Sequence, residues 1–219
     1  VDLLGGLDTL NLGAGITTVT IANVEIVNGT GLNERITMRT APTAETNIQL
    51  GNGADTLVAG SDLAIFDLSA ATLRGVESLV GTRANGTNLV VRMDTLLQGT
   101  AAAVLASIAG NELAPDTLTT ADTQLDLRST TLSSIETIAA GNSGATSFIV
   151  DQADLAASGF VTGNGAAVVD TLVAAGTRLD LTATTLSGID VISAGTSSAT
   201  SFVVNQADLL AGGSVIGDA

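Results

Sequence analysis

Residues 170–194 read DTLVAAGTRLDLTATTLSGIDVISA, and residues 116–140, 54 positions earlier, read DTLTTADTQLDLRSTTLSSIETIAA. The match continues without a gap, so that segments 116–165 and 170–219 are identical at 30 of 50 positions. Self-similarity at a fixed spacing is typical of repeat architectures, in which stacked units share one continuous core. The fold therefore has to be sought in the way such units stack.

The tripeptide Asp-Thr-Leu marks the start of each unit. It begins at Asp8, Asp55, Asp116 and Asp170, with separations of 47, 61 and 54 residues. We therefore expect a single repeat domain over residues 1–219. Its four units run approximately over 8–54, 55–115, 116–169 and 170–219, and the last is expected to continue beyond the end of the chain.

A second motif recurs once in every unit. It consists of an apolar residue, any residue, a small residue or Asn, then Ile or Val, an acid, any residue and another apolar residue. The motif persists where the rest of the unit has diverged, which predicts a shared local geometry. Its acids are Glu25, Glu77, Glu136 and Asp190.

The apolar residues of each unit have the period of short β-strands. Runs such as TTVTIA at 17–22 and VISA at 191–194 alternate apolar and polar residues or are β-branched, and Gly, Asn, Ser and Thr separate them. Strands spaced about 8 to 12 residues apart fit an antiparallel sandwich or a solenoid. The repeat favours the solenoid, because identical strands stack in register only if the chain returns to the same face.

We therefore predict an all-β, parallel β-solenoid, β-helix or β-roll-like, built from four degenerate repeats of about two coils each. Each coil would take about 20 to 27 residues. We expect Leu172, Val191 and Val215, or Asp180 and Val203, to recur on equivalent faces. The insertion AAAVLASIA at 101–109 has high helix propensity and is expected to form a short surface helix.

Composition supports this fold and excludes several classes of function. Hydrophobic residues make up 45% of the chain and aromatic residues only 2%, which suits aliphatic stacks inside a narrow solenoid. Cysteine and histidine are absent, which removes thiol nucleophiles, histidine-based triads and the usual zinc ligands. A net charge of −15 without any lysine excludes a typical nucleic-acid binder, and we interpret this acidity as a solvated exterior. The longest apolar stretch is far shorter than the roughly 20 residues of a spanning helix, so we expect no membrane insertion.

The segment Leu50–Val58, with the sequence LGNGADTLV, is similar to the nonapeptide GGxGxDxUx of the repeats-in-toxin (RTX), hemolysin-type family. Gly5–Leu10 is a weaker copy. The longer unit resembles the degenerate β-solenoid repeats of large secreted bacterial surface proteins of the adhesin or S-layer type. This resemblance implies type I secretion, an extracellular or cell-surface location in bacteria, and calcium bound between coils.

The spacing of the aspartates bears on calcium. The candidate metal-binding residues are Gly53, Asp55 and Asp8. If a unit is two coils, Asp116 and Asp170 lie about 9.6 Å apart, too far to share an ion. Aspartates at corners also cap turn amides, which is the favoured reading. No cofactor is required on this reading, and a single Ca²⁺ near Gly53 and Asp55 stays open.

The recurring acids allow two interpretations of function. Two carboxylates at the right distance can hydrolyse glycosides, and pectin-lyase-like solenoids carry such acids with calcium. A repeated acid is more typical of a solvated face, whereas a catalytic site normally breaks a repeat. We therefore predict a structural, non-enzymatic rod segment of an adhesin, S-layer or fibre subunit. Its partners would be adjoining repeats or further copies joined end to end as a filament. The alternatives are a calcium-binding RTX-type module and a β-helix enzyme that modifies polysaccharides.

Overall fold

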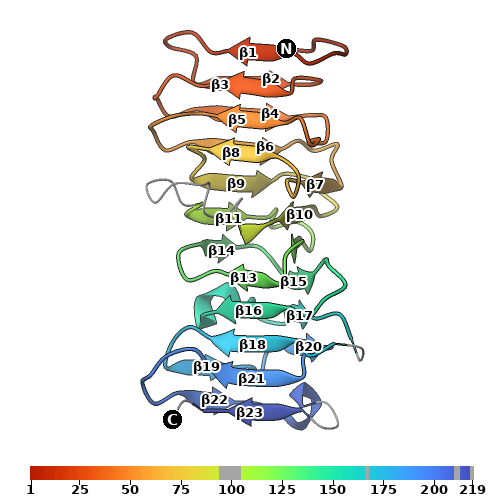
Figure 1. Ribbon diagram of the computed structural model, residues 1–219, viewed down its shortest axis with the longest axis vertical. Helices are drawn as coiled ribbons and strands as arrows, with labels where there is room; N and C mark the ends of the chain where they lie inside the picture. The colour runs from red at the N-terminus through yellow and green to blue at the C-terminus, as the bar shows by residue number, and fades with distance from the viewer. Residues whose placement is uncertain (94–104, 166–167, 210–212, 218–219) are drawn as a thin grey trace.

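The computed structural model describes residues 1–93, 105–165, 168–209 and 213–217. Short strands follow one another along the chain, and every strand pair in this part of the chain is parallel. Successive coils stack along one long axis, with the N-terminus at the top of Figure 1 and the C-terminus at the bottom. The predicted all-β parallel β-solenoid is therefore confirmed.

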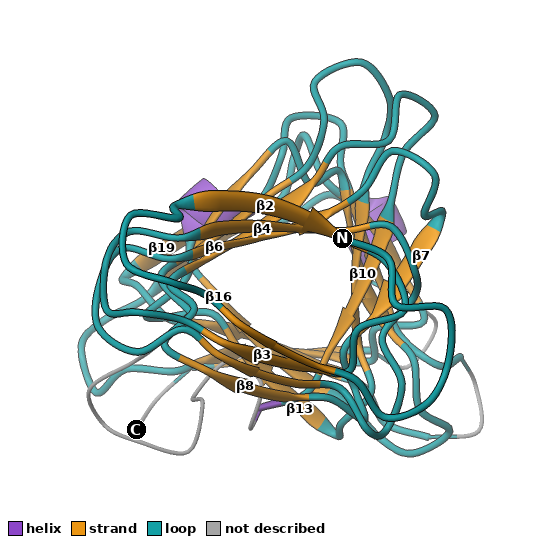
Figure 2. Ribbon diagram, turned by 90° about the horizontal axis from the view of Figure 1, so that it is seen from above, coloured by secondary structure: helices purple, strands orange, loops and turns teal. Residues whose placement is uncertain are grey.

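The cross-section is triangular, with one stack of strands along each side (Figure 2). Face 1 carries β1 (Thr9–Asn11), β3 (Ile26–Asn28), β5 (Asn47–Gln49), β8 (Thr72–Arg74), β13 (Gln124–Asp126), β16 (Ser147–Val150), β18 (Thr171–Ala174), β21 (Val191–Ala194) and β23 (Ser214–Ile216). Face 2 carries β2 (Thr18–Ile21), β4 (Arg35–Met38), β6 (Thr56–Ala59), β9 (Ser78–Gly81), β11 (Ser107–Ala109), β14 (Thr131–Ser133), β19 (Arg178–Asp180) and β22 (Ser201–Val203). Face 3 carries β7 (Ile65–Asp67), β10 (Asn88–Val91), β12 (Thr117–Thr120), β15 (Thr137–Ala140), β17 (Phe160–Thr162) and β20 (Thr185–Ser187).

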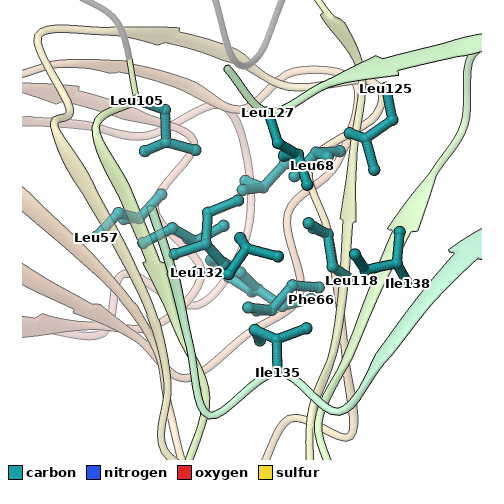
Figure 3. Close-up of a cluster of buried hydrophobic side chains, with 14 of the residues drawn as sticks. Leu57, Phe66, Leu68, Leu105, Leu118, Leu125, Leu127, Leu132, Ile135 and Ile138 are labelled. Atoms are coloured by element: carbon teal, nitrogen blue, oxygen red, sulfur yellow. The ribbon is translucent and has the colours of Figure 1, made fainter. Parts of the chain in front are cut away.

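Stacked aliphatic side chains fill the interior of the solenoid. Alternate residues of each strand point inward, and the parallel register places them directly above one another. On face 2, for example, the register aligns four residues that are all fully buried: Ile36, Leu57, Leu79 and Ile108. Figure 3 shows how leucines, isoleucines and Phe66 from all three faces converge on one core. The buried core consists mostly of Leu, Ile and Val, which agrees with the scarcity of aromatic residues in the chain.

The coils vary in length more than the sequence predicts. The register Thr9↔Ile26 defines a coil of 17 residues, and Asn88↔Thr117 defines one of 29. The expected alignment of Asp180 with Val203 is confirmed, and Val215 lies on the face of Leu172 as expected. The residue that pairs with Leu172 is Ile192, one position beyond the expected Val191.

Each repeat spans about two coils, as expected, and one further face. From β12 to β18, which both follow an Asp-Thr-Leu aspartate, the chain passes through β13, β14, β15, β16, the 3₁₀ helix η1 (Gln152–Asp154) and β17. This path takes seven steps from face to face, and a coil has three faces. One repeat therefore spans two coils and one further face. Equivalent residues of successive repeats consequently lie on successive faces instead of stacking.

One position in each of the last two repeats replaces a strand with a turn of 3₁₀ helix. The helix η1 packs between β14 and β19, and η2 (Gln206–Asp208) packs against β20. A capping box closes each helix, with Asp151 or Asn205 as the N-cap. Among the described residues, neither these helices nor any other is long and apolar enough to cross a membrane.

Residues 101–104 of the insertion AAAVLASIA, and with them part of the expected surface helix, lie outside the described residues. The remaining part of the insertion does not form the expected surface helix. Leu105 is fully buried, and Ser107–Ala109 form β11, which pairs with β9 and β14. Position in the stack therefore outweighs the helix propensity of this alanine-rich stretch.

Candidate functional site

The Asp-Thr-Leu aspartates and the acids of the second motif meet at the corners of the solenoid. Each aspartate lies directly before a strand, and the acid lies directly before the neighbouring strand of the next coil. The acid's carboxylate accepts the backbone N–H of the aspartate. These bonds join Asp8 to Glu25 (3.0 Å), Asp55 to Glu77 (2.7 Å), Asp116 to Glu136 (2.8 Å) and Asp170 to Asp190 (2.9 Å).

The chain between the two strands of the second motif explains its residue pattern. The small residue or Asn takes a left-handed conformation, with φ between 50° at Asn23 and 67° at Gly188. The Ile or Val that follows is buried in the core, and the acid comes next. In the last three repeats, the backbone N–H of the acid then donates to the carbonyl oxygen of the aspartate one coil earlier, as at Glu136 and Asp116 (3.1 Å). The motif is therefore a corner that exchanges hydrogen bonds between adjacent coils.

The aspartate side chains reach in the opposite direction, toward the preceding coil. Asp116 Oδ1 accepts the N–H of Thr87 at 2.5 Å, and Asp170 Oδ1 accepts the N–H of Thr146 at 2.6 Å. Their second oxygens accept backbone amides of their own loops, from Asn111 to Asp116 (2.5 Å) and from Asn164 to Asp170 (2.6 Å). Asp55 Oδ1 accepts the N–H of Glu34 at 2.6 Å. We call each set of three a carboxylate corner: Glu34, Asp55 and Glu77; Thr87, Asp116 and Glu136; Thr146, Asp170 and Asp190.

Two glycines make room for these buried carboxylates. A Cβ atom on Gly163 would lie 2.6 Å from Asp170 Oδ2 and 2.3 Å from the carbonyl oxygen of Gly188. A Cβ on Gly110 would lie 2.5 Å from Asp116 Oδ2. Such approaches are shorter than any van der Waals contact, so the corners require glycine at these positions.

Sequence reasoning found the aspartates and their acids but missed the rest of each corner. Glu34, Thr87 and Thr146 carry no local signal, because they lie one coil before the aspartate at irregular separations of 21, 29 and 24 residues. The donors Asn111 and Asn164 follow the two required glycines, and this repeated Gly-Asn pair is the signal that would have revealed them.

The Asp-Thr-Leu aspartates do not lie above one another in a single column. Because each repeat advances by one face, Asp8 lies beside face 1, Asp55 beside face 2, Asp116 beside face 3 and Asp170 beside face 1 again. The expected separation of about 9.6 Å between Asp116 and Asp170 is therefore wrong, since it assumes that they share one column. Nor is the acidity only a solvated exterior, because six carboxylates are buried: Glu34, Asp55, Asp116, Asp154, Asp170 and Asp208.

Calcium binding between Gly-x-Asp turns does not fit this arrangement. Asp8 and Asp55 lie on different faces, so they cannot contribute to one ion. At Gly53 the chain is left-handed, with φ of 146°, and a Cβ there would lie 2.2 Å from the carbonyl oxygen of Leu32. Glycine is thus needed at position 53 because the two adjacent coils pack closely there. Within the described residues, no group of three or more acidic side chains is arranged to hold a metal ion.

No family model matches the chain. Searches of curated proteins and of solved structures likewise find no significant match. The carboxylate corners therefore have to be interpreted from their own geometry.

Burial perturbs two of the carboxyl groups strongly. Burial, together with the nearby carboxylates of Glu34 and Glu77, raises the pKa of Asp55 to about 7. Burial and the charge of Asp151 raise the pKa of Asp154, in the capping box of η1, to about 7. At the surface, the hydrogen bond from Arg128 lowers the pKa of Asp126. The two raised values arise inside the stack and not in an open cleft.

A surface groove of about 360 Å³ lies between β20 and η2. Ser158, Phe160, Thr184, Asn205 and Asp208 are among the residues that line it. Asp208 is the only acidic residue in its lining, and its carboxylate accepts the N-cap N–H of Asn205 at 2.8 Å. The groove thus lacks the pair of facing carboxylates that glycoside hydrolysis needs.

Proposed function

We propose that this chain is a structural, non-enzymatic rod segment of a secreted bacterial cell-surface or extracellular protein, of the adhesin, S-layer or fibre type. One observation carries the proposal. The recurring acids, which an enzyme or a calcium module would use, instead accept backbone amides and thereby link successive coils.

The geometry suits resistance to bending and pulling. The hydrogen bonds of parallel strands run from coil to coil, and the same ladders repeat along three faces. Each carboxylate corner adds bonds across three consecutive coils, and successive repeats place it on successive faces. Reinforcement is therefore distributed around the axis, which keeps one side of the rod from opening before the others.

The location and the partners belong to the same proposal. Extracellular export by a type I system rests on the resemblance of Leu50–Val58 to RTX repeats. The proposed partners are more of the same repeat, because a parallel strand pairs with any adjoining coil in matching register. Further units of a longer chain, or further copies of this one, would extend the stack in this way.

Electron microscopy of the purified protein with and without calcium tests the proposal. We expect straight rods in both conditions and an unchanged melting temperature after addition of a chelator. A melting temperature that falls with chelator would favour the calcium-binding module. Hydrolysis or lysis of a polysaccharide that Glu77→Gln abolishes would favour the enzyme and overturn the structural role.

A further inference from the structure

The Asp55 corner departs from the two later corners in a way that changes its chemistry. Where those corners have Thr87 and Thr146 before the strand, this one has Glu34. The later aspartates also receive an amide on each oxygen, whereas Asp55 Oδ2 has no hydrogen-bond donor. The corner in which one aspartate oxygen lacks a hydrogen-bond donor is therefore also the corner that contains a second carboxyl group, that of Glu34.

Both carboxyl groups are enclosed. Glu34 is 1% exposed and Asp55 is 0% exposed. Glu34 Oε1 accepts both the N–H and the hydroxyl of Thr30, while Glu34 Oε2 has no donor. The backbone N–H of Glu34 donates to Asp55 Oδ1 at 2.6 Å, and the Glu34 carboxyl group contributes to raising the pKa of Asp55. Two buried, unpartnered carboxylate oxygens therefore belong to residues in direct contact.

The charges around this pair do not compensate two negative carboxylates. The third acid of the corner, Glu77 on the next coil, adds a further negative charge. No basic side chain contributes to the electrostatics of Asp55, and Arg35, next to Glu34, is exposed on the outer side of β4. Like charges in contact and out of water cannot both remain ionised without a partner.

We propose that Glu34 and Asp55 bind one proton between them, as a buried carboxylic acid–carboxylate hydrogen bond that joins two adjacent coils. The proton supplies the donor that Glu34 Oε2 and Asp55 Oδ2 otherwise lack. This corner is thus a proton-binding site, whereas the Asp116 and Asp170 corners are closed by amides alone. The inference does not depend on the structural role proposed above.

The sign of the resulting pH dependence follows from the raised pKa of Asp55. An unfolded Asp loses its proton near pH 3.8, whereas the folded pair holds it up to a pH of about 7. The stabilisation is therefore complete below pH 3.8 and is lost as the pH rises through 7. Over this interval the unfolding equilibrium constant gains a factor of about ten per pH unit from this one proton. Asp154 contributes a similar slope, so the test must compare variants.

Amide substitutions test the proposal, since an amide supplies a permanent donor. In Glu34→Gln the Nε2 group can donate to Asp55 Oδ2, and in Asp55→Asn the Nδ2 group can donate to Glu34 Oε2. Each variant should fold and should show a pH slope between 4 and 7 that is smaller by one proton than that of the unmodified chain. Asp116→Asn is the matched control, because its Nδ2 would face an N–H donor. We expect Asp116→Asn to raise the unfolding equilibrium constant about a hundredfold at every pH.

Infrared spectroscopy provides a second readout that does not depend on stability. At pH 6 the unmodified chain should show the C=O band of protonated carboxyl groups, and Glu34→Gln should lose one such group. An unchanged pH slope in both amide variants, or a missing band, would overturn the proposal. So would a rise in the melting temperature on adding calcium or sodium at pH 6 that Glu34→Gln abolishes, because a cation and not a proton would then join the carboxylates.

Discussion

Two kinds of corner hold adjacent coils together, and they use opposite hydrogen-bonding roles. At a carboxylate corner such as that of Asp170, the side chain accepts backbone N–H groups. At a threonine corner such as Thr130, the hydroxyl donates to a backbone carbonyl, here that of Leu105 at 2.8 Å. Both residues lie directly before a strand and both are buried. A turn that leaves backbone N–H groups without a partner thus takes an acidic residue, which accepts hydrogen bonds. A turn that leaves a carbonyl oxygen without a partner takes a threonine, whose hydroxyl donates one.

The largest expected difference between the two kinds of corner is seen on truncation. Asp170→Ala would leave the amides of the buried Thr146 and the half-buried Asn164 without acceptors, at a cost of about 3–5 kcal/mol in the free energy of unfolding. Thr130→Ala removes one neutral bond and should cost about 1 kcal/mol. Urea unfolding followed by circular dichroism measures both. Equal losses of stability in the two variants would show that the carboxylate corner stabilises the fold no more than the threonine corner does.

A second prediction concerns the space that the carboxylate corner requires. Gly163→Ala would force a Cβ against Asp170 Oδ2 and the Gly188 carbonyl, at a cost of about 1–3 kcal/mol. Gly176→Ala is the control, because a Cβ there meets nothing within 4 Å. We expect its unfolding midpoint in urea to stay close to that of the unmodified chain. If Gly163→Ala behaves like the control, the carboxylate is not held where we describe it.

The acid that completes the corner should tolerate one substitution and not another. In Glu136→Gln the amide oxygen still accepts the N–H of Asp116, so we expect a loss below about 1 kcal/mol. Glu136→Ala leaves that N–H without its acceptor and should cost about 1–3 kcal/mol. Thermal melting of both variants at one pH gives the comparison. A larger loss for Gln than for Ala would contradict the acceptor role.

The repeat and the alternation of apolar residues were sufficient to predict the parallel solenoid and the alignment of Asp180 with Val203. They did not reveal the number of faces per repeat, because the strands at 131–133 and 185–187 are three residues long and are separated from their neighbours by turns as short as three residues. From the spacing of the strands alone, a repeat of two coils was therefore expected, whereas each repeat contains two coils and one further face.

The candidate site was predictable only in part for a related reason. The aspartates and their acids repeat in sequence, which made them visible. Their partners Thr87 and Thr146 are placed by the stacking of coils of unequal length, and a single threonine in a chain rich in threonine gives no signal. The burial of these carboxylates was missed, because an acidic residue in a repeat normally indicates a solvated surface.

A buried acid that lies outside the corners gives a pH-dependent test. Asp154 Oδ2 accepts the N–H of Asp151, and burial raises the pKa of Asp154 to about 7. The protonated group favours the folded state, so its contribution to stability is present below pH 3.8 and disappears as the pH rises through 7. Asp154→Asn keeps an acceptor for Asp151 and should flatten this part of the pH profile. Stability is measured by urea unfolding at several pH values. If its pH dependence is the same in Asp154→Asn as in the unmodified chain, Asp154 does not contribute to it.

The smallest effect should come from charges that lie on the surface. Arg39 and Asp62 pair at 2.9 Å, but their side chains are 61% and 59% exposed. Water and salt screen such a pair, and ordering two long side chains offsets most of its attraction, so Arg39→Ala should change the free energy of unfolding by less than about 1 kcal/mol. Measurement in low and high salt should show that even this difference shrinks. If it instead matched the loss in Asp170→Ala, burial and backbone partners would not explain why the carboxylate corners stabilise the stack.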